Sequence, residues 1–169
     1  MRRAAAMAMT GTTPRRRTAA TSSRQLAALR GNTFGALAML IVQFAVGIVD
    51  NLYATIPAKD QGSGIVGAIG RALTNGPASL AAHAGLGLLI VLAGVALVVR
   101  SIVTRHTASI VLSVIGLAAI VSAALNGARF VADGGPASAS LAMALSTAAA
   151  MLCYAIGLLL LGFSRPSAS

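Results

Sequence analysis

The chain has 169 residues, of which 57% are hydrophobic and 9% charged, and its formal net charge is +10 at pH 7. A mean hydropathy of +0.85 lies outside the range of soluble domains, so the composition excludes a soluble globular protein. In a soluble domain the positive charge would favour nucleic-acid binding, but the positions of the arginines, described below, exclude a nucleic-acid partner.

Residues 1–31 combine Arg, Ala, Thr and Ser with one proline, Pro14, and contain no acidic residue. We find no apolar face at helical spacing there, and we expect a disordered basic tail in the cytoplasm. An organellar transit peptide has a similar composition and is one alternative. A true start at Met7 or Met9 is another.

Four long apolar runs follow, at about residues 34–53, 78–99, 107–127 and 137–163, each bounded by charge, Gly or Pro. A helix of about 20 residues, rising about 1.5 Å per residue, crosses a hydrocarbon core of about 30 Å. The predicted fold is therefore all-α, an integral membrane four-helix bundle of two antiparallel up-down hairpins. It occupies residues 32–164, and residues 165–169 form a short cytoplasmic tail.

The segments between the runs predict short connections and one extra helix. Ile65, Ile69 and Leu73 recur every four residues, which indicates a short amphipathic helix in the membrane interface. Asn75, Gly76 and Pro77 end it, and Gly134, Gly135 and Pro136 similarly precede the last run. We expect His106 to be solvated and Thr107 to be the N-cap of the third span.

The basic residues lie mostly on one side of the predicted membrane. The other side holds Lys59, Arg71 and Arg129 with all three acids, Asp50, Asp60 and Asp133. This bias predicts a multi-pass protein of the cytoplasmic (inner) membrane with both termini in the cytoplasm. The lipid bilayer is the expected partner, together with a homo-oligomer or a larger membrane complex. The arginines on the first side are Arg2, Arg3, Arg15, Arg16, Arg17, Arg24, Arg30, Arg100, Arg105 and Arg165.

Small and hydrogen-bonding residues mark where the spans face one another, because lipid tails and leucine are about equally apolar and close packing drives helix association. Stripes of such residues run along the first three spans. The positions predicted to pack between helices are Gln43, Gly47, Gly87, Gly94, Ser113 and Gly116.

One polar cluster is a candidate site in the outer third of the bundle. Asp50, Asn51, His83, Asn126 and Arg129 come from three spans at similar depth. A carboxylate within a span requires compensation, and His83 and Arg129 are the available partners. The functional hypothesis is a ligand-binding or proton-linked Asp50–His83 pair in a pocket open to the outside. The structural alternative is that Asp50 caps the first span while His83 makes an interhelical hydrogen bond.

Catalytic and metal signatures are missing from the sequence. It contains no Glu, no P-loop and no G-x-S-x-G or H-E-x-x-H motif, so we expect no enzyme and no metal site. Cys153 is the only cysteine. The segment starting His83-Ala-Gly-Leu-Gly-Leu resembles the haem-facing helix of four-helix membrane cytochromes and haem A synthases. That resemblance implies haem as a cofactor, but His106 lies at the opposite membrane face and a second histidine at the level of His83 is missing.

In layout the whole chain resembles small four-span membrane proteins of high-GC bacteria, a likeness that no motif defines. We expect a non-enzymatic accessory subunit of a membrane assembly or a binder of a small ligand at the outer face. The alternative is a small proton-linked transporter or a haem-binding redox protein that uses Asp50, His83 and Arg129.

Overall fold

Five helices make up the described part of the computed structural model, which covers residues 14–53 (backbone only for 14–22), 56, 58, 61–62 and 64–163. They are α1 (Pro14–Tyr53), α2 (Gly64–Thr74), α3 (Ala78–Thr104), α4 (Thr107–Ala132) and α5 (Ala137–Phe163). Ser23–Tyr53 of α1 and the whole of α3, α4 and α5 are long and apolar enough to cross a membrane. The predicted all-α membrane bundle is confirmed.

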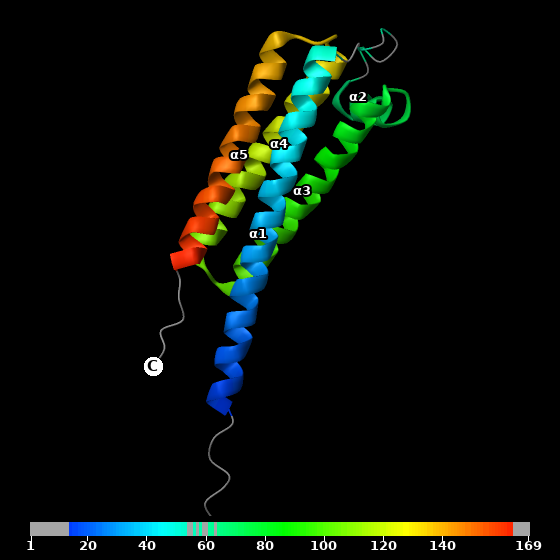
Figure 1. Ribbon diagram of the computed structural model, residues 1–169. Coiled ribbons are helices and arrows are strands. Elements are labelled where there is room, and N and C mark those ends of the chain that lie inside the picture. The colour runs from blue at the N-terminus through cyan, green and yellow to red at the C-terminus, as the bar shows by residue number, and fades with distance from the viewer. Residues whose placement is uncertain (1–13, 54–55, 57, 59–60, 63, 164–169) are drawn as a thin grey trace, which may run out of the picture.

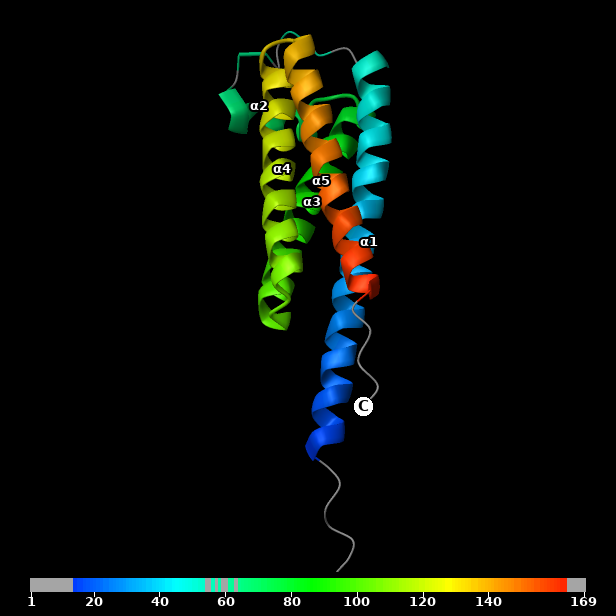
Figure 2. The same ribbon diagram turned by 90° about the vertical axis from the view of Figure 1, so that its left-hand side faces the viewer.

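The four long helices run antiparallel to their neighbours along the chain, as Figures 1 and 2 show. α1 packs against α3 and α5, and α4 packs against the same two helices, so α1 and α4 lie diagonally across the bundle. The short helix α2 lies against α3 and α4 at one end, which we call the α2 end. The start of α1 and the end of α5 lie at the opposite end, which we call the terminal end.

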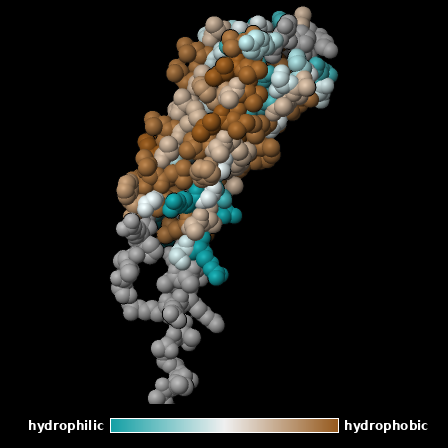
Figure 3. Space-filling model, in the orientation of Figure 1, coloured by the Kyte–Doolittle hydropathy of each residue, from teal (hydrophilic) through white to brown (hydrophobic). Residues whose placement is uncertain are grey.

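The face of the bundle seen in Figure 3 is mostly apolar between its two ends. Leu92 is 66% exposed, and Leu145 and Leu159 are each 62% exposed. Together with the many other exposed apolar side chains of the four long helices, they form a surface suited to lipid. The protein is therefore a polytopic membrane protein.

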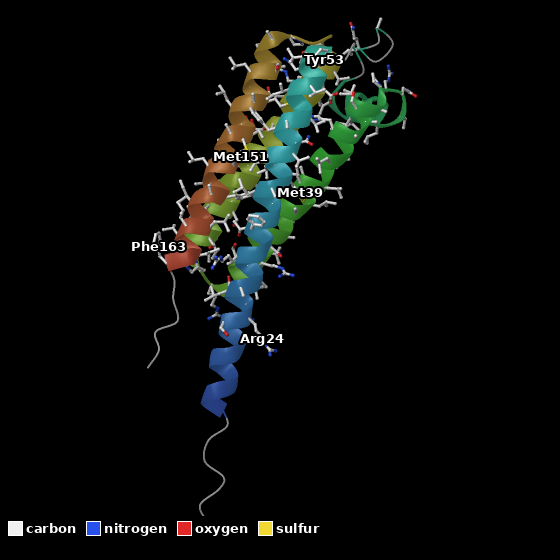
Figure 4. The ribbon with its side chains drawn as sticks, viewed as in Figure 1. Arg24, Met39, Tyr53, Met151 and Phe163 are labelled. Atoms are coloured by element: carbon white, nitrogen blue, oxygen red, sulfur yellow. The ribbon has the colours of Figure 1, made fainter. Side chains whose placement is uncertain are left out.

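The interior depends on close packing around one aromatic side chain. Tyr154 of α5 is 1% exposed and lies in the main core with Leu29, Ile90 and Ile120. A Cβ atom placed on Gly116 would lie 2.5 Å from the ring of Tyr154, and one placed on Gly94 would lie 3.4 Å from its hydroxyl oxygen. Gly116 therefore requires a residue without a side chain, whereas a Cβ on Gly94 would make ordinary contact with the Tyr154 hydroxyl. Met39 and Met151, labelled in Figure 4, pack against this core.

The prediction of a disordered tail is wrong for residues 14–31, because α1 begins at Pro14 and these residues are helical. Proline is favoured at the first position of a helix. Leu26 and Leu29 then continue the apolar face, with Leu29 1% exposed in the core. This part of α1 projects past the end of α5, as the positions of Arg24 and Phe163 in Figure 4 show. Residues 1–13 lie outside the described part of the chain.

Two further details differ from the sequence prediction, and one agrees with it. α3 and α4 continue to Thr104 and Ala132, five residues beyond the predicted ends of their spans. The N-cap of α4 is His106, whose Nδ1 accepts a hydrogen bond from the Ser109 backbone amide, so Thr107 is not the cap. The predicted amphipathic helix is confirmed as α2, which buries Ala68 and Ala72 against the bundle.

Candidate functional site

The contact between Gln43 of α1 and His83 of α3 organises the α2 end of the bundle. The Gln43 side-chain amide nitrogen, Nε2, lies 3.0 Å from the His83 backbone oxygen and 3.2 Å from His83 Nε2. Each helix also has a glycine four residues after its contact residue, and the side chain from the other helix lies against that glycine. A Cβ on Gly47 would lie 2.9 Å from His83 Cε1, and one on Gly87 would lie 3.2 Å from Gln43 Nε2.

These hydrogen bonds assign the tautomer of His83. A backbone oxygen only accepts hydrogen bonds, so the atom of Gln43 beside it is the amide nitrogen, which only donates. His83 Nε2 faces the same amide nitrogen and therefore accepts, which places the imidazole proton on Nδ1. Gln43 thus keeps the His83 ring neutral, with the Nδ1–H directed away from the Gln43 side-chain amide.

Asp50 lies in the last turn of α1, on the same face as Gln43 and Gly47. Its side chain is buried, with 6% exposure, and Oδ2 lies 4.0 Å from His83 Nδ1. That distance permits an electrostatic interaction but is too long for a direct hydrogen bond. Among the described residues, neither oxygen of the Asp50 carboxyl group has a hydrogen-bond partner. Because α1 continues to Tyr53, Asp50 does not cap its end.

Asp50, His83 and Gln43 form one wall of a pocket of about 310 Å³. All five helices contribute to the pocket, and α2 covers it at the α2 end through its contacts with α3 and α4. The remaining walls are mostly apolar. Representative side chains are Leu40, Phe44, Ile69, Leu80, Leu88 and Phe130.

The other predicted site residues are not all brought to this pocket. Asn51 lines it and accepts a hydrogen bond of 2.9 Å from Ser140 Oγ of α5. Asn126 does not line the pocket, and its side-chain amide donates to the Ser122 backbone oxygen. Arg129 is exposed and also lies outside the pocket lining, so it is not the partner of Asp50 in this structure.

The aromatic and α2 walls of the pocket were not identified from the sequence. Phe44 and Phe130 line it from α1 and α4, and Ile69 lines it from α2. The regular spacing of Ile65, Ile69 and Leu73 predicted that α2 has an apolar face, but did not say what that face covers. Contacts of Ala68 and Ala72 with Ala128 and Val131 fix α2 over the pocket.

The geometry of the histidines bears on the haem and metal hypotheses. The two ring nitrogens of His83 face Gln43 and Asp50, and His106 caps α4 at the terminal end. Within the described ranges, no three His, Cys, Asp or Glu side chains are grouped to hold a metal ion. The site therefore offers a buried carboxylate and amide beside a fixed imidazole, which is chemistry for holding a polar group.

Three buried hydroxyl groups, those of Thr33, Ser101 and Thr147, form hydrogen bonds within their own helices and so do not extend this polar cluster. Thr33 and Ser101 donate to the backbone oxygens of Leu29 and Leu97, four residues earlier on their own helices. Thr147 likewise donates to Met143. These groups are satisfied locally, as hydroxyls in membrane helices commonly are, and they do not link one helix to the next.

Comparisons with protein-family models, curated proteins and solved structures gave no match to this chain. The fold and the pocket by themselves define a polytopic helical membrane protein with an interior pocket at the α2 end.

Replacing Gly47 by alanine tests the reciprocal packing of Gln43 and His83. We expect Gly47→Ala to displace the His83 ring, weaken its bonds to Gln43 and lower stability by about 1 to 3 kcal/mol, as overpacking does. Thermal unfolding followed by circular dichroism in detergent micelles measures the change. Gly85→Ala is the matched control, because a Cβ there meets only Leu73 Cδ2 at 3.9 Å. Equal melting temperatures for the two variants would contradict the packing account.

Proposed function

We propose that this protein binds a small molecule in the pocket at the α2 end and performs no chemical reaction on it. The observation that carries the proposal is the composition of the pocket. Mostly apolar walls from five helices surround a polar cluster of Gln43, Asp50 and His83. Four buried atoms of this cluster, Gln43 Oε1, Asp50 Oδ1, Asp50 Oδ2 and His83 Nδ1, have no hydrogen-bond partner among the described residues. Concave, mostly apolar sites with a few polar groups are typical of small-molecule binding.

The arrangement of these groups favours binding over catalysis. His83 Nε2, the nitrogen that a general base would use, already accepts a hydrogen bond from Gln43. Ser140 also lines the pocket, but its hydroxyl donates to Asn51 and is not directed at His83. The pocket therefore supplies groups that orient a ligand, without an activated nucleophile.

The proposed location is the cytoplasmic membrane, with the terminal end in the cytoplasm and the pocket toward the outer side. This orientation is supported by the charges at the two ends. Arg24, Arg30, Arg100 and Arg105 belong to the terminal end, whereas the basic residues of the described α2 end are Arg71 and Arg129. Basic residues near the ends of membrane helices are retained on the cytoplasmic side.

Reporter fusions test this orientation. Alkaline phosphatase, which is active only outside the cytoplasm, should be active when inserted between Gln61 and Gly62 and inactive when fused after Ser169. Green fluorescent protein fused after Ser169 should fluoresce, since it matures in the cytoplasm. The opposite pattern would place the pocket on the inner side and overturn the proposed orientation.

Photolabelling with a small uncharged aryl diazirine tests whether the pocket admits a molecule. In lipid nanodiscs, we expect peptide mass spectrometry to find label on Phe44, which lines the pocket, in addition to lipid-facing residues such as Leu159. Ala144→Phe should fill the pocket, because Ala144 is part of its lining. That variant should lose the label on Phe44 while Leu159 is labelled as before. Label on Phe44 that persists unchanged in Ala144→Phe would contradict binding in the pocket.

A further inference from the structure

The unpartnered atoms of the polar cluster are nearly all hydrogen-bond acceptors. Buried atoms without a partner at this site are Gln43 Oε1, Asp50 Oδ1, Asp50 Oδ2 and His83 Nδ1. The three oxygens accept hydrogen bonds when Asp50 is ionised, and the Nδ1–H of His83 is the one donor among the four. The cluster therefore lacks donors, and a ligand that completes it must bring them.

The charge of the cluster adds a second requirement. An ionised carboxylate at membrane depth is costly unless an opposite charge or hydrogen bonds compensate it. Within the described residues, His83 is the only group in ion-pair range of Asp50, and its hydrogen bond from Gln43 holds it neutral. Arg129, the cation predicted for this role, is exposed and outside the pocket. A cationic ligand would supply the missing charge.

The surroundings of Asp50 distinguish an organic from an inorganic cation. Hard metal ions such as Ca²⁺ take about six to eight oxygen ligands, whereas the unpartnered buried oxygens of the cluster are Gln43 Oε1, Asp50 Oδ1 and Asp50 Oδ2. Phe44 and Phe130 additionally offer aromatic surface to a ring or to a cation. A volume of about 310 Å³ is at the small end for ligand pockets.

We propose that the ligand of this pocket is a small protonated primary amine with an apolar body, whose ammonium group donates hydrogen bonds to Asp50. The inference rests on the proposed function, because it names the chemical class of molecule that the same pocket takes. The apolar body lies against the walls formed by α2, α3 and α4, and the ammonium group faces the end of α1. The assignment is to a free amine, because a pocket volume of about 310 Å³ suits a small molecule.

Binding of tritiated 4-phenylbutylamine to the full-length protein tests this proposal. The protein is placed in nanodiscs of phosphatidylcholine and phosphatidylglycerol, which contain no primary amine. We expect saturable binding that is weakened about tenfold to a hundredfold by Asp50→Asn, the loss typical of a hydrogen bond to a charged group. Asp133→Asn is the matched control, because Asp133 carries the same charge at the α2 end but is exposed and outside the pocket lining. Binding by Asp50→Asn equal to that by Asp133→Asn would overturn the proposal.

Competition against the wild-type protein tests the donor requirement without any substitution. The trimethylammonium analogue keeps the charge but has no N–H, and 4-phenylbutanol keeps a donor but has no charge. Both should compete at least about tenfold less well than the unlabelled amine. Equal competition by the trimethylammonium analogue would overturn the assignment of an N–H donor. Loss of binding in nanodiscs containing phosphatidylethanolamine would assign the site to a lipid headgroup and overturn the free amine.

The two proposals fail in different ways. If the aryl diazirine labels the pocket but 4-phenylbutylamine does not bind, the amine assignment is wrong and binding of some other small molecule stands. If neither enters the pocket, both proposals are wrong. The diazirine is uncharged and needs no contact with Asp50, so its result does not depend on the polar cluster.

Discussion

The hydrogen bonds from Gln43 to His83 are the constraint on which the α2 end of this bundle depends. They join α1 to α3, and the glycines at positions 47 and 87 leave the space in which each side chain lies against the other helix. In a membrane, helices associate through such close approach and hydrogen bonding, because apolar burial alone does not distinguish lipid from protein. The same bonds fix the His83 ring, and so determine which of its nitrogens faces Asp50.

The polar cluster and the pocket follow from that contact. Gln43 uses its donor atom on His83, and its own oxygen and both oxygens of Asp50 are unpartnered in the same mostly apolar pocket. The walls of this pocket therefore differ in chemistry: hydrogen-bond acceptors lie at the α1 wall, and the other walls are mostly hydrocarbon. Its chemistry is suited to a molecule with donors at one end and an apolar body at the other. The helix α2 gives the site a cover, because it buries Ala68 and Ala72 on α4.

The sequence predicted the four spans and their antiparallel order because hydrophobic length and turn residues are local signals. It also indicated that Asp50 and His83 lie at similar depth. It did not predict which face each polar residue takes within a helix bundle, and so included Asn126 and Arg129, which lie outside the pocket. The sequence did not predict that Leu26 and Leu29 belong to the apolar face of α1, because arginine and serine dominate the residues around them. Leu29 is nevertheless part of the core. The aromatic walls depend on how distant helices meet, which composition cannot show.

The most direct test of this account is the ¹⁵N NMR spectrum of the His83 ring in lipid nanodiscs at neutral pH. The chain has two histidines, so a His106→Asn variant, which retains a residue suited to capping α4, leaves His83 as the only signal. The account predicts a neutral ring with Nδ1 protonated and Nε2 unprotonated, and loss of that preference in Gln43→Leu. A ring protonated at Nε2 in the otherwise unchanged protein would contradict it.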